Sequence, residues 1–153
     1  MQREILFRGL KADGSNEWVI GNLFVPNQLV KGVYICPSTT MADFAPDFED
    51  GDDFEESKKS GCALGHFHEV IPETVGQFCG LTDKNGTRIF EGDRFKTPNG
   101  FIGVIKWGHR IYREKRNKYE CHGWLYVNDS NNHTETLDSE ILAGEVIGNI
   151  HQK

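Results

Sequence analysis

The chain has 153 residues and a net charge of −6, and 37% of its residues are hydrophobic. This length suits one domain or two small ones, and the composition is too apolar for wholesale disorder and too polar for a membrane-embedded protein. The acidic excess argues against a protein dedicated to coating DNA, because neutralising phosphates normally needs a surplus of lysine and arginine.

The N-terminus alternates charged and apolar residues from Arg3 to Arg8 and so lacks the apolar run of a signal peptide. No later stretch approaches the roughly 20 apolar residues that span a bilayer. Four cysteines are spread along the chain: Cys36, Cys62, Cys79 and Cys121. Because no two of them share a short spacing, they suit reduced thiols in the cytosol. We therefore expect a cytoplasmic protein with no membrane partner.

Strand-like patterns dominate the first half of the chain. The segment from Trp18 to Val25 predicts a strand with a bulge at Gly21 and Asn22, because the apolar residues change parity there. The β-branched and aromatic residues of 29–36 predict another strand. We expect an N-terminal meander of antiparallel strands within residues 1–80.

An acidic insert at residues 43–59 interrupts these strands. Its eight carboxylates are Asp43, Asp47, Glu49, Asp50, Asp52, Asp53, Glu55 and Glu56. Like-charge repulsion makes a mobile loop the default interpretation. Phe44, Phe48 and Phe54 complicate that default, because clustered aromatic residues usually find a surface to cover. We treat these three phenylalanines as candidate contacts with a protein partner.

Neither calcium nor zinc binding is predicted for the chain. A calcium loop of the EF-hand type fails before Gly51, where Phe48 and Pro46 stand at positions that need oxygen ligands. Potential zinc ligands are Cys62, His66 and His68, with Cys121 and His122 further along the chain. Their spacing matches no recognised zinc motif. With no nucleophile elbow or phosphate loop either, we expect no catalytic residue, cofactor or metal.

Turn signals at residues 83–86, 92–93 and 98–100 separate the predicted strands of the second half. Residues 101–107 alternate as a half-buried strand does, and 119–127 and 146–150 predict two more strands. Asp138 to Gly144 predicts a single helical turn, capped by Asp138 and ended by Gly144 in a left-handed conformation. We expect few helical turns and none that is long.

A basic and aromatic segment spans residues 106–119. We single out as candidate nucleic-acid contacts Lys106, Trp107, Arg110, Tyr112, Arg113, Lys115, Arg116 and Lys118. The ordinary interpretation is a solvated hairpin loop. Such a loop could also lie along phosphates and stack bases, or it could pair with the acidic insert of another subunit.

Several stretches resemble the YopX family, small proteins carried by phages and prophages of bacteria. They are REILFRG (3–9) with EWVIGNL (17–23), PETVGQF (72–78), GLTDKNG (80–86) followed by IFEGD (89–93), and EVIGNI (145–150). The resemblance implies an all-β fold with a small SH3-like barrel in residues 81–153. It implies no catalytic residues and no defined activity.

Together these features predict an all-β, non-enzymatic binding protein of the prophage type. Its regions 1–80 and 81–153 are expected to form one compact unit. It is expected to act through homo-oligomerisation or a protein partner. Nucleic-acid binding through residues 106–119 is the alternative, and an enzyme of unknown class is the third.

Overall fold

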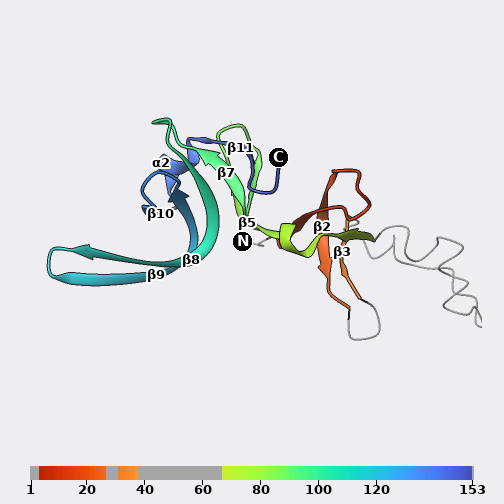
Figure 1. The fold of residues 1–153 in the computed structure, drawn as a ribbon. Coiled ribbons are helices and arrows are strands. Elements are labelled where there is room, and N and C mark those ends of the chain that lie inside the picture. The colour runs from red at the N-terminus through yellow and green to blue at the C-terminus, as the bar shows by residue number, and fades with distance from the viewer. Residues whose placement is uncertain (1–3, 27–30, 38–66, 153) are drawn as a thin grey trace, which may run out of the picture. The chain divides into compact units, whose positions relative to one another are not determined.

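The computed structural model describes residues 4–26, 31–37 and 67–152, which fold mainly into antiparallel strands (Figure 1). The predicted all-β class is confirmed. The contacts divide the chain into an N-terminal unit of residues 5–75 and a C-terminal unit of residues 76–153 with the first four residues. The predicted boundary at 80/81 lies within a strand of the C-terminal unit.

The N-terminal unit is a four-stranded meander. Its strands are β1 (Phe7–Leu10), β2 (Trp18–Phe24), β3 (Val33–Cys36) and β4 (His68–Val70), and a 3-10 turn, η2 (Pro72–Thr74), follows them. Each strand pairs antiparallel with the one before it, as predicted. Val19, Ile35 and Val70 form the buried core of this unit.

Strand β2 does not contain the bulge predicted at Gly21 and Asn22. Its register with β1 and with β3 shows no shift, and Val19, Gly21 and Leu23 lie on one face in regular alternation. A Cβ atom on Gly21 would lie 1.9 Å from the carbonyl oxygen of Cys36. The glycine therefore marks a close approach of two strands, which its sequence neighbours could not reveal.

The C-terminal unit combines a hairpin with a five-stranded antiparallel sheet. The hairpin consists of β5 (Gly76–Thr82) and β6 (Arg88–Phe90). The sheet consists of β7 (Asp93–Lys96), β8 (Ile102–Glu114), β9 (Asn117–Asn128), β10 (Thr134–Thr136) and β11 (Glu145–Asn149). Its strand order is β10-β9-β8-β7-β11.

The predicted SH3-like barrel is not confirmed. Strands β10 and β11 lie at opposite edges of the sheet, and no pairing among the described residues closes it. The core instead joins the hairpin to the sheet through side chains, because Ile89 of β6 packs in one cluster with Phe95 and Ile105, and all three are fully buried.

The predicted helical turn is confirmed as α2 (Ser139–Leu142). The Asp138 carboxylate accepts hydrogen bonds from the backbone N–H groups of Glu140 and Ile141, each at 3.0 Å. Gly144 does not take the predicted left-handed conformation. Glycine is needed there because a Cβ would lie 2.2 Å from the carbonyl oxygen of Lys96.

A buried carboxylate links the first hairpin of the unit to its last strand. Asp83 is 6% exposed. Its Oδ1 accepts hydrogen bonds from the N–H groups of Asn85 and Thr87, and its Oδ2 accepts one from Val146 of β11 at 3.0 Å. Burial raises the pKa of this carboxyl, but the hydrogen bonds outweigh burial and leave the pKa below its ordinary value.

We expect Asp83→Asn to lower the free energy of unfolding by about 2 kcal/mol at neutral pH, because an amide NH₂ cannot accept these hydrogen bonds. A carboxyl whose folded pKa is lowered stabilises the fold above its unfolded pKa, about 4, and loses that contribution as pH falls through the folded pKa. The difference from wild type should therefore shrink on acidification in urea unfolding curves.

The matched control for this prediction is Asp13→Asn. The Asp13 carboxylate also accepts a backbone hydrogen bond, from Ser15, but it lies on the surface. Its replacement should change stability little at any pH. A constant gap between Asp83→Asn and wild type across the acid range would contradict the assigned role of Asp83.

Candidate functional site

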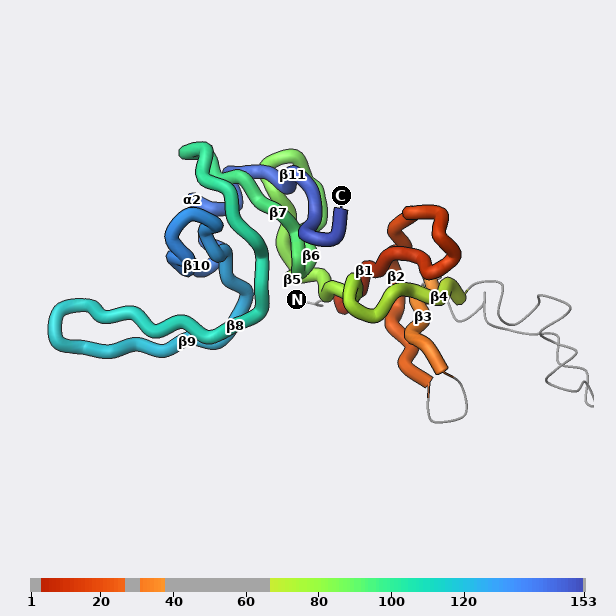
Figure 2. Tube along the Cα trace, viewed as in Figure 1, coloured from red at the N-terminus to blue at the C-terminus, as the bar shows by residue number. Residues whose placement is uncertain are grey.

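The longest feature of the C-terminal unit is the hairpin of β8 and β9, which are joined by twelve residue pairs from Gly103↔Asn128 to Glu114↔Asn117. Strand β7 pairs with β8 only as far as Val104, and β10 pairs with β9 only as far as Leu125. Beyond these points β8 and β9 pair only with each other among the described residues. We call residues 106–124 the arm, and Figure 2 shows it extending away from the other strands of its unit.

The arm turns tightly at Lys115 and Arg116. Lys115 has φ 56°, a left-handed conformation that is uncommon outside glycine, asparagine and aspartate. The residues on either side of this turn pair in unbroken register. The loop predicted from the sequence is therefore a regular two-stranded ribbon with a two-residue turn.

One face of the arm continues the face that Ile105 turns toward the core. Paired residues share a face, and the next two pairs outward are aromatic. The rings of Trp107 and Trp124 meet edge to face with their centroids 5.2 Å apart, and those of His109 and His122 stack at 4.5 Å. Trp107 is 55% exposed. This face therefore presents aromatic surface to solvent beyond the point where the core ends.

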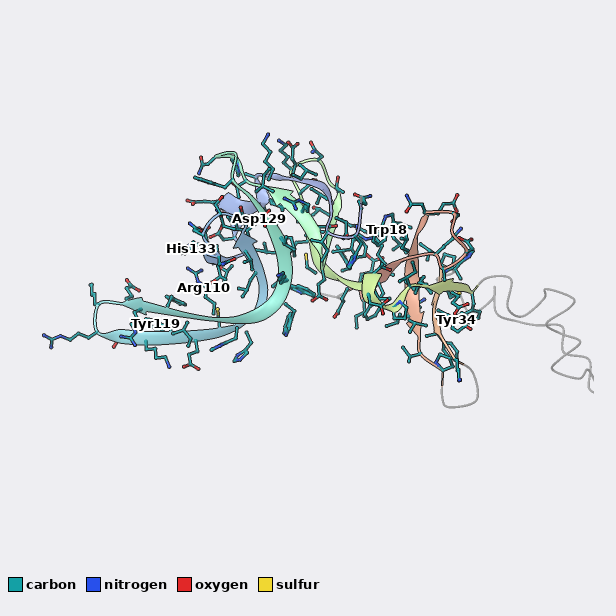
Figure 3. All side chains as sticks on the ribbon, viewed as in Figure 1. Trp18, Tyr34, Arg110, Tyr119, Asp129 and His133 are labelled. Atoms are coloured by element: carbon teal, nitrogen blue, oxygen red, sulfur yellow. The ribbon has the colours of Figure 1, made fainter. Side chains whose placement is uncertain are left out.

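The other face of the arm combines rings with cations. Tyr112 and Tyr119 stack across the strands with their centroids 5.1 Å apart and their planes at 17°. The guanidinium carbon of Arg110 lies 5.5 Å from the centre of the Tyr112 ring, within cation–π range. Figure 3 shows Arg110 and Tyr119 on the arm. Cross-strand pairs of this kind stabilise a ribbon that has no further strand beside it.

Most of the arm's positive charge is not neutralised. Lys118 forms a salt bridge with Glu120 at 2.5 Å, and that hydrogen bond lowers the pKa of the Glu120 carboxyl. Within the described part of the chain, no salt bridge is formed by five other cations of the arm, which are Lys106, Arg110, Arg113, Lys115 and Arg116. The arm is thus a basic element.

The structure brings all eight predicted nucleic-acid contacts onto the arm and divides them between its surfaces. We call the face that carries the tryptophan and histidine pairs the aromatic face, and it includes Trp107, Arg113 and Lys118. Lys106, Arg110 and Tyr112 lie on the opposite face, and Lys115 and Arg116 form the tip. A ligand that touched only one face would meet about half of them.

Sequence reasoning did not name His109, His122 or Trp124 as nucleic-acid contacts, although they complete the aromatic face. A signal for them exists, because the order WGHxxY (107–112) is mirrored by YxxHGW (119–124) about the turn. Mirrored residues pair when a tight turn lies at the centre. This symmetry could have given the register of the arm directly.

The other predicted site residues, Phe44, Phe48 and Phe54, lie outside the described residues, so their contact with a protein partner stays a prediction. Two of the weighed zinc ligands, Cys62 and His66, lie there as well. Across residues 4–26, 31–37 and 67–152, no group of three His, Cys, Asp or Glu side chains could hold a metal ion. The helices in these ranges are too short to cross a membrane.

Two neighbouring side chains on the same face should show where the core ends and the arm begins. We expect Ile105→Ala to lower the free energy of unfolding by about 2 to 4 kcal/mol, because the side chain is fully buried. Trp107→Ala should cost about 1 kcal/mol, since it removes one edge-to-face contact from an exposed ring. Urea unfolding measures both, and equal losses would show that the arm is packed against further structure.

Comparison with known proteins places the chain in a family. The family model described as YopX protein matches residues 40–153, which include the whole arm. No curated protein and no solved structure matches the chain. Because the matched region covers most of its length, the chain belongs to the YopX family.

Proposed function

We propose that the protein binds nucleic acid through the arm, and that the arm lies in the major groove of duplex DNA. The observation that carries the proposal is a regular two-stranded ribbon, exposed on both faces, on which five cations have no salt-bridge partner among the described residues. A solvated loop was the ordinary interpretation of this segment. An ordered ribbon favours binding, because its charges are held in a fixed arrangement.

The dimensions of the arm suit this groove. The major groove of B-DNA is about 12 Å wide and admits a two-stranded β-ribbon. Nine residues of β8 lie in the arm, from Lys106 to Glu114, and at about 3.3 Å each they span roughly 30 Å. The arm can therefore cross the full width of a duplex with cations along most of its length.

The net charge of the chain does not oppose this proposal. The eight carboxylates between Asp43 and Glu56 outnumber the net charge of −6, so the remaining residues are positive on balance. Local potential, not the total, steers a charged ligand. Association with phosphates therefore depends on the positive charge of the arm and not on the net charge of the chain.

The aromatic side chains extend the possible contacts beyond phosphates. Trp107, Tyr112 and Tyr119 are all exposed on the arm. In a groove, such rings can contact sugars and thymine methyl groups. On a single strand they can stack bases, so single-stranded DNA is the comparison ligand.

Self-association through the arm is the second candidate. Beyond Val104 and Leu125 the outer edges of both strands pair with no other strand that the structure describes, and such edges are templates for pairing with another chain. The cations of two arms would repel one another, so this pairing should strengthen as salt increases. Nucleic-acid binding should weaken with salt, which separates the two functions.

The prediction of a partner for the acidic insert, with Phe44, Phe48 and Phe54 as contacts, remains beside these two. The phage or prophage setting expected from the sequence also stays a prediction. DNA binding fits that setting, in which the genome itself is a ready ligand.

Fluorescence anisotropy of labelled duplex and single-stranded oligonucleotides tests the proposal. At low salt we expect duplex binding with a Kd of about 10 µM or tighter, weakening steeply at physiological salt. Replacing Arg113, Lys115 and Arg116 by Ala should weaken binding across sequences and reduce the slope of log K against log salt by between about 2 and 3.

The matched control removes three surface cations of the same unit that lie off the arm, through Lys84→Ala, Arg88→Ala and Lys96→Ala. It changes the net charge equally and should leave most of the affinity intact. Equal losses in the two triple variants, or no binding at low salt, would contradict the proposal. Gel filtration of wild type at low and high salt tests self-association. Pairing of two arms through their edges predicts a larger species at high salt, whereas pairing of the arm with the acidic insert of another subunit predicts a larger species at low salt.

A further inference from the structure

A recess of about 370 Å³ lies at the base of the arm. It is lined by Gln77 of β5, Glu91 of the β6–β7 turn, and Trp107 and Trp124 of the arm. Because Trp107 is 55% exposed, the recess is open to solvent on its outer side. A side chain can therefore enter it while the polypeptide that carries this side chain stays outside.

The two tryptophan rings bound a corner of the recess. Their planes stand at 78° to each other, and their centroids are 5.2 Å apart. Two planes that meet nearly at right angles each turn one face toward the corner between them. Trp124 also packs against the buried core, which fixes this wall in place. The face of an aromatic ring is the negative part of its quadrupole, so the corner attracts a cation.

Backbone hydrogen bonds hold Glu91 beside these rings. Its N–H donates to the carbonyl oxygen of Gln77 at 2.9 Å. The N–H of the next residue, Gly92, donates to the carbonyl oxygen of Ile105 at 2.8 Å. Ile105 lies two residues before Trp107 on β8. The turn that carries the carboxylate is thus bonded to the strand that carries the exposed ring, and the recess does not need a ligand to assemble it.

The carboxylate of the recess has no positive partner among the described residues. Glu91 is half-buried and forms no salt bridge within these ranges. None of the residues that line the recess is a lysine, an arginine or a histidine. Withdrawing a carboxylate from water costs free energy, which a cation in contact with it offsets. The same charge repels phosphates, so the recess is not a nucleic-acid contact.

A pairing of arginine with tryptophan already exists in this chain. The guanidinium carbon of Arg8 lies 4.7 Å from the centre of the Trp18 ring. In the part of the chain that the structure describes, no such cation lies over Trp107 or Trp124. A guanidinium suits the recess better than an ammonium does, because its flat face stacks on an indole while its N–H groups donate to oxygen atoms at its edge.

We propose that the recess binds an arginine side chain of a protein partner. The guanidinium stacks in the corner between Trp107 and Trp124, and its N–H groups donate to the carboxylate of Glu91 and the amide oxygen of Gln77. This site takes a cation, whereas the cations of the arm take phosphates. The inference therefore goes beyond nucleic-acid binding and does not depend on it.

NMR titration of the full chain with short peptides tests the charge requirement. The probe is a capped tripeptide with arginine at its centre, and the comparison peptide carries citrulline, which keeps the shape and removes the charge. We expect the indole N–H signals of Trp107 and Trp124 to shift, and the arginine peptide to bind about tenfold more tightly or better, because charged hydrogen bonds are the stronger ones.

The indole N–H signal of Trp18 is the internal control, since this residue does not line the recess. Equal affinity for the arginine and citrulline peptides would overturn the proposal. A shift of the Trp18 signal without shifts of the other two would overturn it as well, because the peptide would then bind elsewhere.

The free cation n-butylguanidinium distinguishes a peptide from a small molecule as the source of the guanidinium. We expect the arginine peptide to bind more tightly, since its backbone adds contacts around the open side of the recess. Tighter binding of n-butylguanidinium than of the peptide would rule out a protein partner as the natural occupant.

The variant Glu91→Gln separates this site from the arm. We expect its affinity for the arginine peptide to fall about tenfold, toward that of the citrulline peptide, while its affinity for oligonucleotides does not fall. Glu140→Gln is the matched control, because it removes an exposed carboxylate of the same unit that does not line the recess. Equal peptide affinities in these two variants would contradict the role of Glu91.

A second pair of variants tests the aromatic wall. Trp107→Phe keeps a ring face in the corner, whereas Trp107→Leu keeps apolar bulk without a ring. We expect the phenylalanine variant to bind the arginine peptide several-fold more tightly than the leucine variant, because only a ring attracts the guanidinium through its face. Equal affinities would show that the wall acts through its bulk and would overturn the stacked arrangement.

Discussion

Asp83 accepts hydrogen bonds from its own turn with one oxygen and from strand β11 with the other. Strand β11 pairs in turn with β7, so this carboxylate links the first hairpin of the C-terminal unit to the last strand of its sheet. Between them lie Ile89, Phe95 and Ile105, from which water is fully excluded. Because Ile105 belongs to β8, the position of the arm depends on a bond network that the arm itself does not touch.

An isolated two-stranded ribbon is at best marginally stable in water. The arm persists because its base is one part of a packed sheet and because aromatic residues meet in register along its length. Its open edges carry lysine and arginine, which natural proteins use to prevent edge-to-edge pairing. The charges that protect the ribbon from its own copies are the same charges that suit it to phosphates.

Local sequence signals predicted much of this fold. The turn at Asp83 and the helical cap at Asp138 each depend on side chains that bond to backbone a few residues away, and both were predicted. The predictions that the structure does not support concern contacts between residues far apart in the sequence. Gly21 and Gly144 are fixed by carbonyl oxygens of distant residues, and barrel closure depends on which edges meet. The basic and aromatic composition of the arm was recognised from the sequence. The pairing of β8 with β9 was not, although the mirrored order of residues that includes Trp107 and Trp124 indicates it.

The alternation of the arm's two faces restricts how its length can evolve. Adding one residue to a strand would move every side chain beyond it to the other face, and the cross-strand pairs of the arm would be lost. Adding two residues to each strand would keep both faces and carry the tip about 7 Å farther. The arms of homologous proteins should therefore differ by even numbers of residues in each strand. Each step of two residues is about as long as the rise of two base pairs of DNA.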